Sequence, residues 1–71
     1  MDVKERRKLL GQLIKEKRLE GDYSQREFAA IASTEQSYLW KIEHGRTSVG
    51  IDVLCHIADA LDIPVRDLIR F

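Results

Sequence analysis

Apolar residues recur at steps of three and four positions along nearly the whole of this 71-residue chain, and that spacing is the period of the α-helix. Only four glycines and one proline stand against the pattern, so it runs through long uninterrupted stretches. The spacing therefore predicts an all-α fold of short helices without strands. A chain of this length has room for one hydrophobic core, so residues 1–71 are expected to form a single domain.

Breaking and capping residues divide the pattern into five segments. Gly21 ends the first segment, and Ser24 with Glu27 has the spacing of a capping box at the start of the second. Gly45 suits the left-handed residue that closes a helix, and Pro64 suits the first turn of a helix, where its missing N–H costs nothing. The expected helices are residues 3–19, 25–32, 35–44, 51–61 and 64 to the chain end.

One face of each expected helix carries the apolar residues of the core. Facing inward we expect Leu10, Leu13, Ile14, Phe28, Ala29, Ile31, Leu39, Ile42, Ile51, Leu54, Cys55, Ala58, Leu61, Val65, Leu68 and Ile69. Cys55 is the single cysteine and cannot form a disulfide within the chain, which indicates a cytoplasmic protein. No apolar stretch approaches the roughly 20 residues of a membrane span, and the N-terminus lacks the apolar region of a secretory signal. We therefore expect a cytoplasmic protein that does not associate with membranes.

The charge of the chain is zero overall but unevenly distributed. Residues 1–18 carry seven Lys or Arg against three Asp or Glu, whereas residues 19–71 carry five against nine. Zero net charge counts against the simplest form of nucleic-acid binding. A basic end on a neutral molecule can still attract a polyanion locally.

The expected helix at residues 35–44 has an unusual outer face. Packing requires only its inner residues, Leu39 and Ile42. The opposite face carries polar and aromatic side chains, namely Gln36 in the first turn, Ser37, Trp40, Lys41 and His44. Amide, hydroxyl, ammonium and aromatic groups are those with which a helix in the DNA major groove reads base edges. Trp40 has no folding reason to point outward, and three interpretations stay open: a DNA contact, a protein interface, or partial packing against neighbouring helices.

An ordered series of short fragments extends this reading to most of the chain. The fragments are LG at Leu10–Gly11, IK at Ile14–Lys15, Arg18, YSQREFA from Tyr23, QSYLWKIEHGR from Gln36 and LCHIADALDIPVRDLI from Leu54. In this order, from about residue 10 to about residue 69, they resemble the phage-repressor type of helix-turn-helix domain, the lambda-repressor-like or XRE family. The resemblance implies a compact five-helix DNA-binding domain whose second and third helices form the reading unit.

The resemblance also implies roles for particular side chains. The positions that read bases match Gln36, Ser37, Trp40 and Lys41. Contacts to DNA phosphates are expected from Gln25, His44, Arg46 and Thr47, which lie at or beside the ends of the reading helices, and from Arg18 near the end of the first helix. Arg18 and Glu43 match a partly buried ion pair that ties the first helix to the third.

Three positions depart from the family pattern. Ser33 stands where glycine is usual, so a left-handed backbone there would carry strain. Glu35 stands where a capping Ser or Thr is common, and its carboxylate would face the phosphates, which leaves Thr34 or Ser33 as the alternative cap. Trp40 replaces a residue that is usually small.

Nothing in the sequence indicates a catalytic or metal site. GRTSVG at 45–50 has the glycine spacing of a phosphate loop but lacks the Lys-Ser/Thr that follows in such loops. Cys55 and His56 point about 100° apart around one helix and form no dyad, and His44 has no zinc-ligand spacing. We expect no enzyme activity, no cofactor, no metal and no small-molecule ligand.

The sequence thus predicts a bacterial or phage-encoded transcriptional regulator that binds double-stranded DNA as a homodimer, with residues 35–44 in the major groove. Two copies are expected because a monomer reads too few base pairs. Val53, Ile69 and Phe71 are candidates for the dimer interface. The alternative is a protein-interaction module on the same helical scaffold, using Trp40 and the C-terminal helices.

Overall fold

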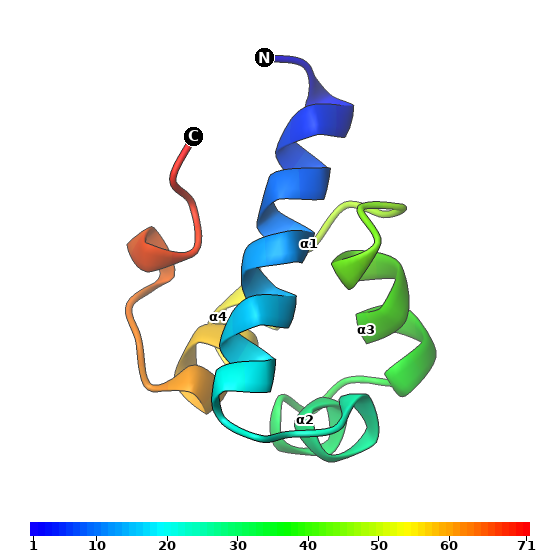
Figure 1. The fold of residues 1–71 in the computed structure, drawn as a ribbon, viewed down its shortest axis with the longest axis vertical. Helices are drawn as coiled ribbons and strands as arrows, with labels where there is room; N and C mark the ends of the chain where they lie inside the picture. The colour runs from blue at the N-terminus through cyan, green and yellow to red at the C-terminus, as the bar shows by residue number, and fades with distance from the viewer.

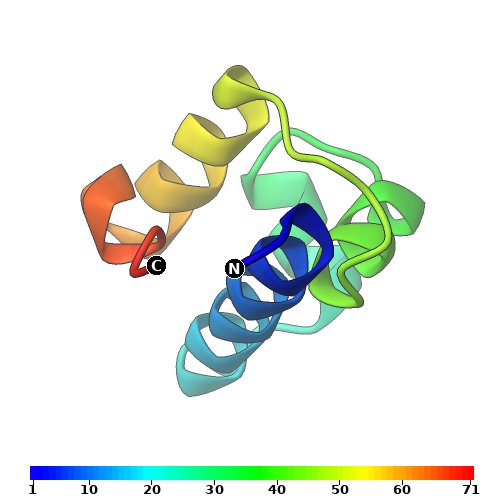
Figure 2. The same ribbon diagram turned by 90° about the horizontal axis from the view of Figure 1, so that it is seen from above.

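Four α-helices and one short 3-10 turn make up the fold, with no strands, in a computed structural model that describes residues 1–71 (Figure 1). The elements are α1 (Val3–Glu20), α2 (Gln25–Ile31), α3 (Gln36–Glu43), α4 (Ile51–Leu61) and the turn η1 (Val65–Asp67). Seen from above, α3 lies on one side of α1, and α4 with the C-terminal segment lies on the other (Figure 2). None of the helices combines the length and the apolar composition that crossing a membrane requires.

The prediction of a fifth α-helix is wrong. Pro64 precedes the last element with an extended backbone, ψ 152°, and only Val65–Asp67 follow as a 3-10 turn. In a 3-10 turn, residues three apart share a side, so Val65 and Leu68 face the core together. Ile69, which was expected inside, is therefore turned outward and is 42% exposed.

The predicted capping box is confirmed at the start of α2. The Glu27 N–H donates to Ser24 Oγ at 3.0 Å, and the Ser24 N–H donates to Glu27 Oε1 at 3.0 Å. The backbone hydrogen bond from Ser24 lowers the pKa of Glu27, with a smaller contribution from its hydroxyl. Because the folded-state pKa is depressed, this stabilisation is present above the ordinary pKa of a glutamate and is lost as the pH falls through the folded-state value.

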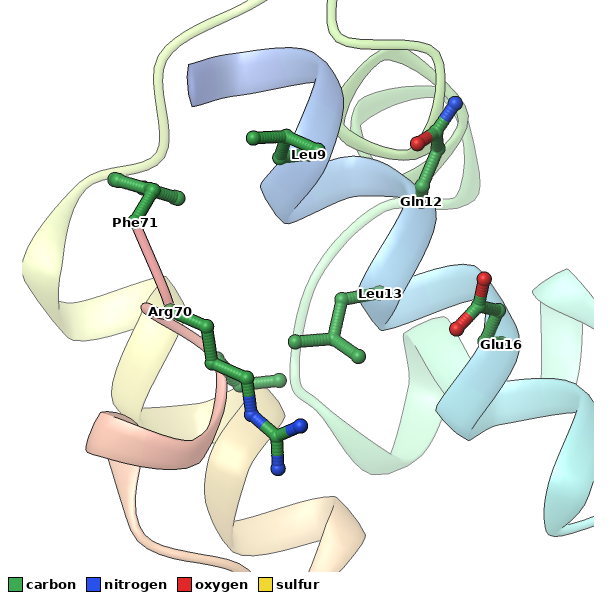
Figure 3. Close-up of a pocket in the computed structure, with 7 residues that line it drawn as sticks. Leu9, Gln12, Leu13, Glu16, Arg70 and Phe71 are labelled. Carbon is green, nitrogen blue, oxygen red and sulfur yellow. The ribbon is translucent and has the colours of Figure 1, made fainter. Parts of the chain in front are cut away.

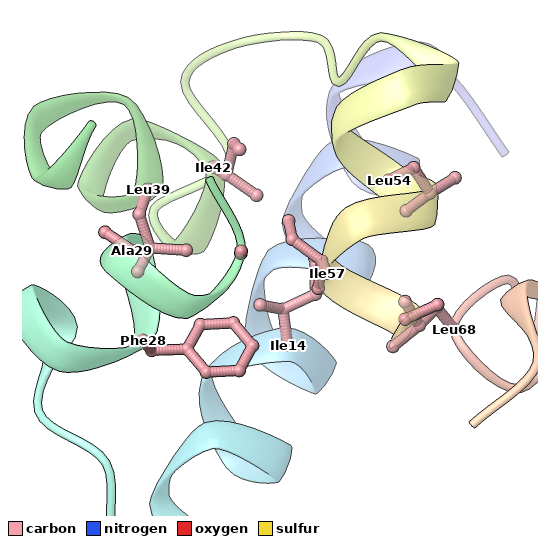
Figure 4. Close-up of a cluster of buried hydrophobic side chains, with 10 residues drawn as sticks. Ile14, Phe28, Ala29, Leu39, Ile42, Leu54, Ile57 and Leu68 are labelled. Atoms are coloured by element: carbon pink, nitrogen blue, oxygen red, sulfur yellow. The ribbon is translucent and has the colours of Figure 1, made fainter. Parts of the chain in front are cut away.

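The hydrophobic core lies where all four helices meet (Figure 4). Phe28 points from α2 toward Ile14 of α1 and Ile57 of α4, and all three are fully buried. The remaining buried apolar residues are Ala29, Ala32, Leu39, Ile42, Leu54, Ala58 and Leu68.

Two further residues expected in the core, besides Ile69, lie outside it. Ile31 is 50% exposed because the buried side of α2 runs through Phe28, Ala29 and Ala32, and Ile31 lies about 100° around the helix from the middle of that stripe. Ile51 is 65% exposed because it opens α4 at the edge of the domain, and the buried stripe of that helix instead runs through Leu54, Ile57 and Ala58. Cys55, beside that stripe, is half-buried.

α1 and α3 cross at Gly11. A Cβ atom at this position would collide with the Ile42 carbonyl oxygen and lie 2.8 Å from that of Glu43. Both contacts are backbone atoms, which cannot rotate away. Only glycine therefore lets these two helices approach as closely as they do.

Candidate functional site

The segment from α2 to α3 is a tight two-helix unit. The Thr34 N–H donates to the Ala29 carbonyl oxygen at 2.9 Å, and Ser33 adopts the left-handed conformation expected at its position, with φ 55°. Glu35 is the N-cap residue of α3, and no side chain accepts a hydrogen bond there. Capping by Thr34 or Ser33 is therefore wrong, since both residues precede the N-cap position. The first N–H groups of α3 are left without a side-chain partner in the chain.

A buried ion pair sets the angle of this unit against α1. Arg18 donates from Nε to Glu43 Oε2 at 2.7 Å and from Nη2 to Glu43 Oε1 at 3.0 Å, and the two residues are 6% and 5% exposed. Arg18 Nη1 donates to the Tyr23 carbonyl oxygen at 2.7 Å, just before α2. One guanidinium thus joins α1, α3 and the entry to α2.

The geometry removes Arg18 from the expected phosphate contacts. Its Nε, Nη1 and Nη2 atoms all donate inside the chain, and almost none of its surface is accessible. Gln25 is half-buried at the start of α2, and its Nε2 donates to Glu43 Oε1 at 3.2 Å. Gln25 is therefore linked to the pair and lies at the edge of the exposed surface of α3.

The outer face of α3 carries the side chains expected to read bases. Gln36, Ser37 and Lys41 are exposed, and none of the three makes a side-chain hydrogen bond within the chain. Trp40 is 39% exposed. These residues share α3, which the Arg18–Glu43 ion pair and the close crossing at Gly11 hold against α1. The outer face of α3 is therefore rigid, and its polar side chains are available to bind a ligand.

Trp40, His44 and Arg46 form a stack that the sequence analysis missed. The His44 ring is 3.9 Å from the Trp40 ring, centroid to centroid, with 20° between the planes. The Arg46 guanidinium carbon lies over the indole at 5.3 Å from its centroid. The four-residue spacing of Trp40 and His44 was the available signal, because such residues are neighbours on a helix surface.

The loop after α3 is held by backbone contacts. Gly45 has φ 67°, as expected, and the Arg46 N–H donates to the Lys41 carbonyl oxygen at 2.9 Å. The Tyr38 hydroxyl donates to the Ser48 carbonyl oxygen at 3.0 Å. Thr47 is half-buried, so of the residues that follow α3 Arg46 is the more accessible one for a ligand.

The residues expected at a dimer interface lie in the C-terminal half of the chain, in different environments. Val53 is half-buried and packs against the core, whereas Phe71 is 46% exposed and, like Ile69, belongs to the last segment. Ile69 and Phe71 are thus exposed to a partner, and Val53 is only partly exposed.

Comparison with known proteins places the chain among helix-turn-helix domains. The family model HTH_3, helix-turn-helix, matches residues 14–68. The restriction-modification controller protein C.AhdI from Aeromonas hydrophila is 31% identical with a TM-score of 0.85, over 87% of this chain and 94% of that chain. The clp gene regulator ClgR from Corynebacterium glutamicum is 29% identical with a TM-score of 0.83, over 87% of this chain and 66% of that chain. A hypothetical transcription factor, NHTF from Neisseria, shares the fold with a TM-score of 0.87 at 22% identity. No curated protein sequence matches the chain significantly.

Proposed function

Since the chain belongs to the XRE-type helix-turn-helix family, we propose that it is a sequence-specific DNA-binding transcriptional regulator that acts as a dimer on a two-fold operator. The observation that carries the proposal is the rigid outer face of α3, on which Gln36, Ser37 and Lys41 are exposed without partners in the chain. The similarity to C.AhdI and ClgR, a controller protein and a gene regulator, supports the same class of function.

In this proposal α3 lies in the major groove. The Gln36 amide at its first turn pairs with adenine, the Ser37 hydroxyl donates or accepts at either member of a pair, and Lys41 meets guanine or phosphate. Arg46 and Thr47 after α3, and Gln25 at the start of α2, contact phosphates on either side. α2 crosses the DNA backbone and sets the depth at which α3 enters.

For the dimer we propose the groove between α1 and the C-terminal segment, which Leu9, Leu13 and Phe71 line and where Leu9 points toward Phe71 (Figure 3). Leu9 is 42% exposed and Phe71 is 46% exposed, so a partner surface would cover apolar area that one copy leaves open. Glu16 and Arg70 line the same groove and form no ion pair within the chain. A two-fold interface pairs such a patch with itself, and an axis near the middle of the groove would bring Glu16 of each copy to the partner's Arg70.

Replacing Gln36 with alanine should lower affinity for the operator by about 1–3 kcal/mol, because a bidentate contact to one base is lost. The fold should be unaffected, since the exposed Gln36 side chain makes no contribution to packing. Fluorescence anisotropy with the operator and with a scrambled duplex measures the effect. The scrambled duplex should bind almost equally to both proteins. Unchanged operator affinity in the folded variant would remove Gln36 from the reading surface.

Salt dependence tests whether the surface binds DNA at all. Wild-type affinity for a duplex should fall steeply between about 50 mM and about 200 mM salt, because neutralised phosphates release counterions. Arg46→Ala should weaken binding to every sequence alike and reduce the slope of log K against log salt by about one. Arg66→Ala is the matched control, an exposed arginine in η1 on the opposite side of α1 from α3 (Figure 2). A flat salt response of the wild type would favour a protein-interaction surface built around Trp40.

A further inference from the structure

The Trp40 stack joins a helix to the loop that follows it. Trp40 and His44 belong to α3 and its C-cap, whereas Arg46 lies beyond the left-handed Gly45. An exposed arginine in a loop ordinarily samples many rotamers, and so does an exposed histidine. Here both side chains are instead arranged on one indole, at 3.9 Å for the imidazole ring and 5.3 Å for the guanidinium carbon.

Three features of the backbone fix this arrangement. The Gly45 N–H donates to the Ile42 carbonyl oxygen at 3.0 Å and the Arg46 N–H to that of Lys41 at 2.9 Å, which closes α3 and sets the direction of Arg46. The Gly45 α-carbon also abuts α1, since a Cβ there would lie 2.9 Å from the Lys8 α-carbon. The loop therefore has little freedom to carry Arg46 away from the ring.

The imidazole of His44 is oriented by a hydrogen bond of its own. Its Nδ1 lies 2.8 Å from the Trp40 carbonyl oxygen. A carbonyl oxygen only accepts, so Nδ1 carries the proton and donates. This bond holds the imidazole against the indole, and the indole is thereby steadied from within its own helix.

We propose that Trp40 is a positioning residue, whose indole holds the Arg46 guanidinium in place for a DNA phosphate, and that Trp40 does not read a base. The proposal rests on the proposed function. A guanidinium over an aromatic ring is attracted by the ring quadrupole and has lost part of its rotational freedom before DNA arrives. Binding of a phosphate by Arg46 then costs less conformational entropy of the side chain. An indole already engaged by His44 and Arg46 also has less surface to offer a thymine methyl group.

A double-mutant cycle tests this role in DNA binding. Trp40→Ala should weaken binding to all duplexes by about 2- to 5-fold, the range of an exposed cation–π contact, and should leave the selected sequence unchanged. It should add less than about 2-fold to the loss already caused by Arg46→Ala, because the two residues act as one unit. Trp40→Phe should restore most of the affinity, since a phenyl ring also attracts a guanidinium. Additive losses, or a new base preference in Trp40→Ala, would overturn the proposal.

A second measurement on the free protein separates this proposal from the proposed function. Trp40 is the single tryptophan, so fluorescence excited selectively in tryptophan, and not in the two tyrosines, reports on the stack. His44→Ala should make the indole more accessible to quenching by acrylamide, and Arg46→Ala should do so to a smaller extent. Unchanged quenching in both variants would show that the stack is absent and would refute the inference. Intact stacking in a protein that binds no DNA would instead refute the proposed function and, with it, the positioning role.

Discussion

Replacing Glu43 with alanine is expected to cost about 3–5 kcal/mol of folding free energy, because it leaves the Arg18 guanidinium buried without its counter-ion. Arg18 is 6% exposed and makes two hydrogen bonds to Glu43, at 2.7 and 3.0 Å, so water cannot replace the lost partner. A small domain is commonly stable by only about 5–15 kcal/mol. The variant should therefore lie close to the unfolding transition, which urea titration followed by circular dichroism measures.

The matched control replaces both charges. An Arg18→Met/Glu43→Leu variant should be more stable than either single variant, because apolar side chains of similar size leave no charge stranded. Recovery should stay incomplete, since the Tyr23 carbonyl oxygen and the Gln25 amide each lose a partner. A loss below about 1 kcal/mol in Glu43→Ala is the size expected of a solvent-exposed pair, and it would contradict the burial of this one.

Gly11→Ala should be nearly as damaging, with a loss of about 3 kcal/mol or more from overpacking. Alanine is favoured over glycine in a helix interior by about 1 kcal/mol, which works in the opposite direction. The collision should prevail because the new Cβ would meet the Ile42 and Glu43 carbonyl oxygens, which belong to the backbone of α3. α1 and α3 would have to separate. Because the Arg18–Glu43 ion pair joins the same two helices, the separation would strain that pair as well.

Gly50→Ala provides the comparison, since no atom lies within 4 Å of a Cβ built there. Its backbone, with φ −65°, suits any residue, and alanine is only a weaker N-cap. The change in unfolding free energy should stay within about 1 kcal/mol. If thermal melts showed that Gly11→Ala stabilises the protein as a helix-interior substitution normally would, the close crossing of α1 and α3 would be wrong.

Local chemistry explains which elements could be predicted. The features that were predicted each depend on residues within one or two helical turns of one another. They are the capping box at Ser24 and Glu27, the left-handed Gly45 and the spacing of Leu54 and Ala58. The bounds of α1 to α4 therefore fall within a residue or so of the expected ranges. η1 could not be distinguished from an α-helix, because Val65, Leu68 and Ile69 have the same apolar spacing in both and only the packing of Leu68 decides between them.

Features that depend on contacts between two segments distant in the sequence could not be predicted. Ile31 and Ile51 have the composition of core residues, and only the arrangement of the helices exposes them. Gly11 matched the family pattern, but its reason, the α3 backbone against it, appears only in three dimensions. The sequence shows that Trp40 has no folding reason to point outward, whereas its contact with Arg46 depends on how the chain turns at Gly45.

The central claim is that α3 reads DNA in a two-fold dimer, and the most direct measurement is selection of random duplexes by the purified protein at about 50 mM and about 200 mM salt. A dimer that reads DNA with α3 should enrich an inverted repeat whose half-sites are centred about one helical turn apart, roughly 34–36 Å, at both salt concentrations. Binding that disappears at the higher salt without enriching any sequence would contradict that claim.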